Sequence, residues 1–279
     1  MNKPRDNYIM LPPMRLNEGV RIAYVNQMVN LFKPYLIEAQ NFVRKLEDDG
    51  TLDETPMQVR IKLEKLKKEF QKALNTKGRE YTLRMYLALL KSNDAAFRAA
   101  IKNIMINSSN PNLIGTIAIL RDLNAGLGKR RKNLSSEEKK TINFEINTIM
   151  AYMSAILGEF VAKVMFFIGQ SIFDKGDSNI LNKVGEAASK AIKRVMMVSN
   201  DQLHKLNQHN VLQYMMENNI YEFIWEHTNS SERFREYHKY VLNGETFDIR
   251  NPPVIDPKTG VRGFPGDLAF CKCAIVPVI

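Results

Sequence analysis

The two cysteines of the chain, Cys271 and Cys273, are separated by a single residue near its end. Together with His227 and His238 they supply four nitrogen or sulfur atoms, the number of ligands that a structural zinc site needs. The spacing argues against this use, because Cys-x-Cys lies outside the common ligand patterns and ten residues separate the two histidines. We therefore predict buried thiols beside hydrogen-bonded histidines, with no bound metal and no cofactor.

An enzymatic alternative is a hydrolytic site built from His238, Asp248 and Asp256. Their spacing does not define a nucleophile, a base and an electrostatic stabiliser together. The glycines before Lys129 do not form a phosphate loop either, because Arg130 stands where that motif requires a hydroxyl residue. We expect a protein that is not an enzyme.

The formal net charge of +10 gives the surface a field that favours polyanions. Two groups of basic residues are candidate contacts with DNA or an acidic partner: Lys65, Lys68 and Lys72 on a predicted helix, and Lys129, Arg130, Arg131 and Lys132 in a glycine-containing segment. Aromatic residues are not interleaved with these charges, which favours contacts with the phosphate backbone over base stacking. The alternative is that these side chains are simply solvated.

Helices must position most of these side chains. Apolar spacing predicts helices at Arg15–Lys45 and Met57–Leu74, and two shorter ones separated by "KSND", with Asn93 or Asp94 as the N-cap. Ser135 and Glu138 fit a capping box that begins the longest helix, which runs to Gly176. A last amphipathic helix is predicted from Ile180 to about Val198.

The most apolar window, Ile149–Gly169, approaches the length of a membrane span. It contains Glu159 and Lys163, whose charges a bilayer disfavours, so we expect a buried helix and no membrane association. The first residues lack an apolar stretch of signal-peptide length, which predicts reduced thiols made in a cytosol.

The residue pattern changes after Asn200, where short β-prone stretches alternate with turn residues. We therefore predict a mainly α protein, with a helical domain with long central helices at residues 1–199 and a small α+β C-terminal module at residues 200–279.

This C-terminal module carries an ordered set of motif residues: Asp201, Gln202, Lys205, Leu206, Asn207, Glu232, Arg233, Arg235, His238, Leu242, Gly244, Phe247, Pro265, Gly266, Cys271, Cys273 and Pro277. The set resembles the C-terminal module of phage Mu F-like head morphogenesis proteins, which are minor head proteins of tailed phages. The chain departs from the family pattern in two places. Many members carry a further Cys-x-x-Cys after the tryptophan that corresponds to Trp225, and this chain lacks it; Lys272 stands where the family has an arginine.

The resemblance implies a structural protein, present in several copies in the virion at the head interior or portal vertex and made in the host bacterial cytoplasm. Its expected partners are the portal protein, the major capsid protein and packaged double-stranded DNA. The alternatives are a DNA-binding protein without a capsid role and a small hydrolase using His238. The residues expected to form the core of the module are Trp225, Arg233, Arg235, His238, Gly244, Phe247, Pro265, Gly266, Cys271 and Cys273, with Leu242 and Phe264 packed beside them.

Overall fold

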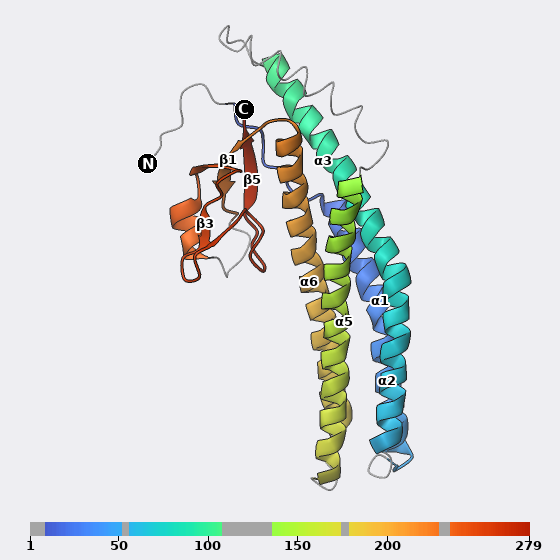
Figure 1. Cartoon of the computed structure of the whole chain (residues 1–279). Coiled ribbons are helices and arrows are strands. Elements are labelled where there is room, and N and C mark those ends of the chain that lie inside the picture. The colour runs from blue at the N-terminus through green and yellow to red at the C-terminus, as the bar shows by residue number, and fades with distance from the viewer. Residues whose placement is uncertain (1–8, 52–55, 108–135, 174–178, 229–234) are drawn as a thin grey trace. The chain divides into compact units, whose positions relative to one another are not determined.

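The computed structural model describes residues 9–51, 56–107, 136–173, 179–228 and 235–279 (Figure 1). Its helices are α1 (Glu18–Asp48), α2 (Pro56–Ala73), α3 (Arg79–Asn107), α5 (Ser136–Phe173) and α6 (Ile180–Glu217), with the π-helical turns η1 (Leu74–Gly78) and η4 (His238–Leu242). Its strands are β1 (Glu222–Glu226), β2 (Thr246–Asp248), β3 (Val254–Asp256), β4 (Val261–Arg262) and β5 (Ala274–Val278). The prediction of a mainly α chain with a small strand-containing C-terminal module is confirmed.

Contacts divide the chain into two compact units. We call residues 21–85 and 140–200 the helical unit, and residues 1–20, 86–139 and 201–279 the mixed unit. These limits differ from the predicted domains 1–199 and 200–279. The reason is that the mixed unit recruits segments from far upstream, since the backbone N–H groups of Ile9 and Ile279 each donate to the other's carbonyl at 2.9 Å.

An apolar seam holds the helical unit together. On α2, Val59, Leu63, Leu66 and Phe70 are all buried, as their spacing indicates. The Phe70 ring packs edge to face on that of Phe32, with centroids 4.4 Å apart. Figure 1 shows parts of α1, α2, α5 and α6 running alongside one another in this unit.

The prediction of two helices separated by "KSND" is wrong, because α3 runs unbroken from Arg79 to Asn107. Asn93 is 4% exposed inside this helix and is not an N-cap. No glycine or proline interrupts the stretch, and polar residues lower helix propensity only by several tenths of a kcal/mol each, about 0.5. Burial of Phe97 and Ile101 favours continuation of the helix.

The predicted end of the last helix near Val198 is also too early, since α6 continues to Glu217. The buried face of the helix continues through Ser199, Gln202 and Leu206. Because the first two of these are polar, an apolar pattern misses the continuation.

The mixed unit is built on a three-stranded antiparallel sheet in the order β2-β1-β5. In its register Ile224 lies opposite Thr246 of β2 and Val276 of β5. The N-terminal segment extends this sheet through a bridge from Met10 to Val278. Strands β3 and β4 form a separate hairpin.

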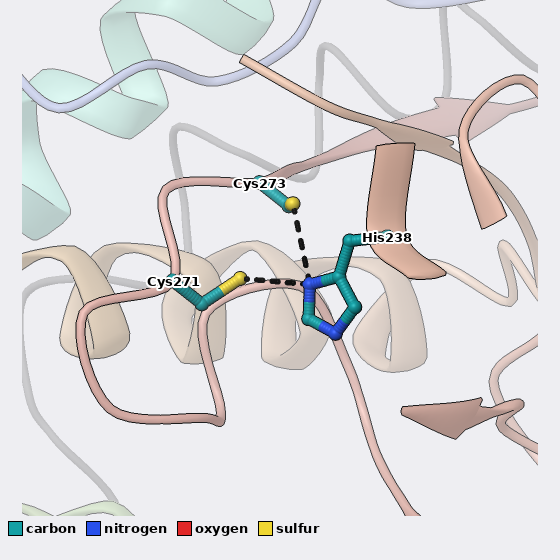
Figure 2. Close-up of side chains that lie close together, drawn as sticks. All are labelled: His238, Cys271 and Cys273. Atoms are coloured by element: carbon teal, nitrogen blue, oxygen red, sulfur yellow. Dashed lines mark hydrogen bonds between the residues drawn. The ribbon is translucent and has the colours of Figure 1, made fainter. Parts of the chain in front are cut away.

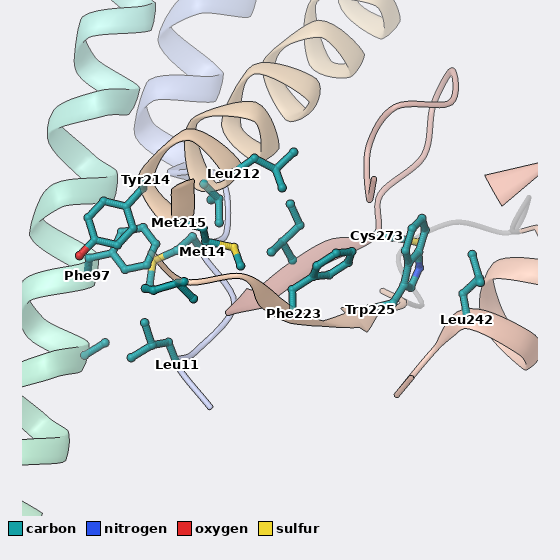
Figure 3. Packing of buried hydrophobic residues seen from close by; sticks show 14 of the residues in the cluster. Leu11, Met14, Phe97, Leu212, Tyr214, Met215, Phe223, Trp225, Leu242 and Cys273 are labelled. Carbon is teal, nitrogen blue, oxygen red and sulfur yellow. The ribbon is translucent and has the colours of Figure 1, made fainter. Parts of the chain in front are cut away.

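One continuous apolar cluster fills the mixed unit (Figure 3). It joins Leu11 of the N-terminal segment, Phe97 of α3, Tyr214 of α6 and Trp225 of β1. The rings of Phe97 and Tyr214 stack with centroids 3.7 Å apart. The cluster therefore joins the N-terminal segment and α3 to the C-terminal part of the chain, from which they are distant in the sequence.

Helix α5 is long and apolar enough to cross a membrane, by length and composition alone. The candidate stretch is Lys139–Ile172, and its most apolar 18-residue window has a mean hydropathy of 1.6. Of that window, 39% is buried inside the protein. Core helices of proteins that do not enter a membrane pass the same test, and α5 buries Ile149, Met153 and Phe160 among others.

Candidate functional site

The side chains of His238, Cys271 and Cys273 meet in the interior of the mixed unit (Figure 2). The Nδ1 atom of His238 lies 3.5 Å from the Sγ atom of Cys271 and 3.7 Å from that of Cys273. All three side chains are buried, and both cysteines are free thiols. Two soft sulfur atoms and one imidazole nitrogen therefore converge on a common point.

The hydrogen bond on the far side of the His238 ring fixes its tautomer. Nε2 lies 2.9 Å from the carbonyl oxygen of Ile255, which can only accept, so Nε2 carries the hydrogen. The Nδ1 lone pair is then directed at both thiols. The turn η4 supplies the histidine, and a hairpin strand supplies the carbonyl that orients it.

The two cysteines lie in the segment just before β5. Both thiols face Nδ1 of His238, at 3.5 and 3.7 Å. The hydroxyl of Thr228 donates to the carbonyl oxygen of Lys272 at 2.6 Å and holds the residue between them.

The surroundings treat the two sulfur atoms differently. A hydrogen bond from the Cys273 thiol lowers the pKa of Cys271, and His238 and the backbone N–H groups of Cys273 and Gly266 lower it further. The pKa of Cys273 is raised by that hydrogen bond with Cys271 and by burial, while Trp225 and Arg235 act in the opposite direction. Cys271 is therefore the sulfur atom that the fold best prepares to carry a negative charge.

His227 stands next to this cluster at the end of β1. Its Nδ1 atom lies 3.5 Å from the Sγ atom of Cys273, and burial lowers the pKa of its ring. His227 also lines a surface pocket together with His204, Glu226 and Lys272. The cluster is thus close to solvent on the side of His227.

The remaining predicted core residues differ in their burial. Trp225 is fully buried, and its ring lies edge-on to His238 with centroids 5.0 Å apart. Leu242 is buried, whereas Phe247 and Phe264 are only partly buried against the cluster. Pro265 is buried, whereas Arg235 and Gly244 are exposed, so the prediction that these two belong to the core is wrong. Gly244 and Gly266 have positive φ angles, and Arg235 donates to the carbonyl oxygen of Ala269 at 2.9 Å.

Sequence reasoning missed His204 and Gln208, which fasten the cysteine segment to α6. Nε2 of His204 donates to the carbonyl oxygen of Cys273, and Oε1 of Gln208 accepts from the N–H of Ile275, both at 2.9 Å. Asp201 adds a third anchor by accepting from the N–H of Phe270 at 2.5 Å. The spacing 201, 204, 208 puts these side chains on one helix face, a signal that a search for polar periodicity would find.

The predicted basic residues lie in two places. Lys65, Lys68 and Lys72 are exposed on α2. Lys65 pairs with Glu69 at 3.9 Å, whereas Lys68 and Lys72 make no ion pair with any residue that the structure describes. The second basic group (Lys129, Arg130, Arg131 and Lys132), together with Arg233 and the capping residue Ser135, lies outside the described residues.

The proposed hydrolytic residues are occupied by other contacts. Asp248 makes an ion pair with Arg250 at 2.5 Å, and Asp256 accepts from the hydroxyl of Thr259 at 2.9 Å. His238 uses one ring nitrogen on a backbone carbonyl and directs the other at thiols. These contacts favour a structural use of all three residues.

Fold and site together define a mainly α protein whose small sheet-bearing unit is fastened around a buried cluster of thiols and histidine. No protein-family model, curated protein or solved structure matches the chain.

Proposed function

We propose that the protein is a structural minor head protein of a tailed phage, which associates with the portal or the inner capsid surface and assists head assembly. The observation that carries the proposal is the ordered set of motif residues between Asp201 and Pro277, which resembles the C-terminal module of phage Mu F-like head proteins. The described members of that set belong to one compact unit.

The contacts of the motif residues support a structural role. The Nδ2 group of Asn207 donates to the carbonyl oxygen of Met14 at 2.7 Å, and so links α6 to the N-terminal segment. Asp201 pairs with Lys205 at 3.2 Å and also caps the backbone before the cysteines. These contacts give the motif residues a structural role, so their presence does not require a catalytic function.

Charge supports contact with packaged DNA as a second part of the same role. The net charge of +10 and the exposed Lys68 and Lys72 on α2 suit weak, sequence-independent binding to phosphates. Such binding lets a head protein lie beside packaged DNA without requiring a sequence-specific site.

The test is co-expression with the portal and the major capsid protein encoded in the same phage genome. We expect the full chain to co-purify with one of them and to be present in purified particles, while the portal of an unrelated phage retains none. Absence from particles together with failure to bind portal and capsid protein would overturn the proposal. Tight binding to free duplex DNA in that case would favour the DNA-binding alternative.

A further inference from the structure

We infer that Cys271, Cys273 and His238 bind one zinc ion, with His227 as the fourth ligand. This reverses the expectation from spacing alone, and it does not depend on the proposed function. The argument rests on the distances between the candidate ligand atoms, on the groups behind them and on the burial of the site.

The distances fit a tetrahedral centre. Zinc binds sulfur at about 2.3 Å and imidazole nitrogen at about 2.0–2.1 Å, so neighbouring sulfur and nitrogen ligands in a tetrahedron lie about 3.6 Å apart. The two distances from Nδ1 of His238 to the sulfur atoms are 3.5 and 3.7 Å. The three ligand atoms all lie within 4.8 Å of one another, so a single ion can reach them with small side-chain adjustments.

The groups behind the ligands suit a metal centre as well. A histidine that binds zinc almost always donates its other ring N–H to a carbonyl or carboxylate, and His238 donates to Ile255. Without a metal, the Nδ1 lone pair can accept a hydrogen from only one of the two thiols at a time, and the other thiol has the neighbouring sulfur atom, a weak acceptor, as its partner. With zinc, the ion replaces both thiol hydrogens, two protons leave to solvent, and the two thiolates neutralise the charge of the ion.

A buried donor beside Cys273 favours a thiolate there. Among the described residues, the buried indole N–H of Trp225 has no partner other than the sulfur atom of Cys273, and its ring packs on His238. A thiolate at Cys273 supplies an acceptor for this buried donor, which a protonated thiol does poorly.

His227 completes the coordination from the accessible side. Its Nδ1 lies 3.5 Å from the Cys273 sulfur atom but outside the mutually close group of three, so its half-buried ring must turn toward the ion. His227 also lines a surface pocket, so its ring lies between that pocket and the sulfur atom of Cys273. Two sulfur and two nitrogen ligands in a tetrahedron select zinc over magnesium or calcium, which prefer oxygen ligands.

Elemental analysis of the full chain, purified without chelator and with its thiols reduced, is the first test. We expect one zinc per chain in the wild type, and loss of that zinc in Cys271→Ser, Cys273→Ser and His238→Gln. His209→Gln is the matched control, because this exposed histidine pairs with Asp267 at 3.2 Å and not with the cluster, so it should keep its zinc. Zinc retained in Cys271→Ser, or a wild type that holds no zinc while its thiols are reduced, would overturn the inference.

A second measurement decides the matter if the ligand variants fail to fold. The wild-type protein is stripped of metal and titrated with cobalt, which reports tetrahedral thiolate coordination by its visible absorbance. We expect saturation at one equivalent, displacement by zinc, and a melting temperature at least about 5 °C lower in excess chelator. An absent cobalt spectrum with an unchanged melting temperature would exclude the site.

The fourth ligand has its own variant. His227→Ala should weaken zinc binding by at least about 10- to 100-fold, because this is the loss commonly caused by removing a group that only supports a ligand, and His227 is a ligand itself. An affinity equal to that of the wild type would overturn the assignment of His227.

Discussion

The two compact units bury different kinds of polar side chain. Among the residues that the structure describes, the buried polar side chains of the helical unit are small hydroxyl groups: Thr82, Ser171 and Ser199. Those of the mixed unit are amides, imidazoles and a carboxyl group: Asn93, Asp201, Gln202, His204, Asn207, Gln208, Asn210 and His238.

This difference follows from how the backbone polar groups of each unit find their hydrogen-bond partners. Helices satisfy their own backbone groups, so packing one helix on another needs only matching apolar stripes. The mixed unit contains short strands and long turns, whose backbone groups need partners from side chains. The helical unit is therefore held together by the packing of complementary apolar faces. In the mixed unit, directional hydrogen bonds also specify where each segment lies.

The largest effect should come from removing a buried aromatic side chain in either unit, which tests whether apolar packing matters equally in both. Phe70→Ala in the helical unit and Trp225→Ala in the mixed unit should each lower the free energy of unfolding by about 3–5 kcal/mol. Denaturant unfolding followed by circular dichroism measures both. A loss below about 1 kcal/mol at Trp225 would mean that the mixed unit is held by its polar contacts alone.

Buried polar side chains should separate the two units clearly. Asn207→Leu removes the donor to the carbonyl of Met14 and should cost about 1–3 kcal/mol, because that carbonyl is left without this partner. Ser199→Ala in the helical unit should be neutral or slightly stabilising, since its buried hydroxyl has no hydrogen-bond partner among the described residues. Equal effects in the two variants would remove the proposed distinction.

Two glycines test how strictly each unit specifies its backbone. Gly266 has a φ angle of +95°, and a Cβ atom there would lie 3.1 Å from Cγ of Gln208. Gly266→Ala should therefore cost about 1–3 kcal/mol. It should also disturb the backbone N–H group that faces Cys271.

Gly78 of the helical unit is the matched case. Its backbone carries no positive φ angle, and an added Cβ would press against the flexible ends of Leu74, Met150 and Leu31, at 2.9, 3.2 and 3.3 Å. The gain of about 1 kcal/mol in helix propensity from Gly78→Ala offsets this crowding, so we expect a net change within about 1 kcal/mol. Thermal melts of the two variants compare the units directly, and a larger loss at Gly78 would reverse the expected order.

The same contrast explains how much could be predicted from the sequence. The seam of α2 was predictable because Val59, Leu63 and Phe70 repeat at helical spacing. The end of α6 and the unbroken α3 were not, because their buried faces continue through polar residues such as Gln202 and Asn93. Apolar periodicity cannot report a face that is held by hydrogen bonds.

The candidate site shows the same limit. The sequence identified His227, His238 and the two cysteines as a set, but ligand spacing argued against a metal. Spacing is informative when one local turn supplies the ligands, whereas here η4, the end of β1 and the segment before β5 bring them together. The carbonyl group of Ile255, which orients the His238 ring, lies on β3, and no local sequence pattern predicts this contact.

Surface charges should give the smallest effects, and there the two units should not differ. Glu159 and Arg194 form an exposed ion pair in the helical unit, and Arg194→Gln should change the free energy of unfolding by less than about 1 kcal/mol. In the mixed unit, hydrogen bonds from the side chain and backbone N–H of Arg250 lower the pKa of Asp248 to about 2.

A carboxyl group with a lowered pKa contributes stability above its unfolded value of about 3.9, and that contribution is lost as the pH falls through the folded value. An NMR titration of the Asp248 carboxyl carbon should therefore have its midpoint near pH 2. Arg250→Gln should move the midpoint toward 3.9 without reaching it, because the backbone N–H of residue 250 still donates to the carboxylate at 2.7 Å. A midpoint that stays near 2 in the variant would show that the side chain of Arg250 is not the cause of the lowered pKa.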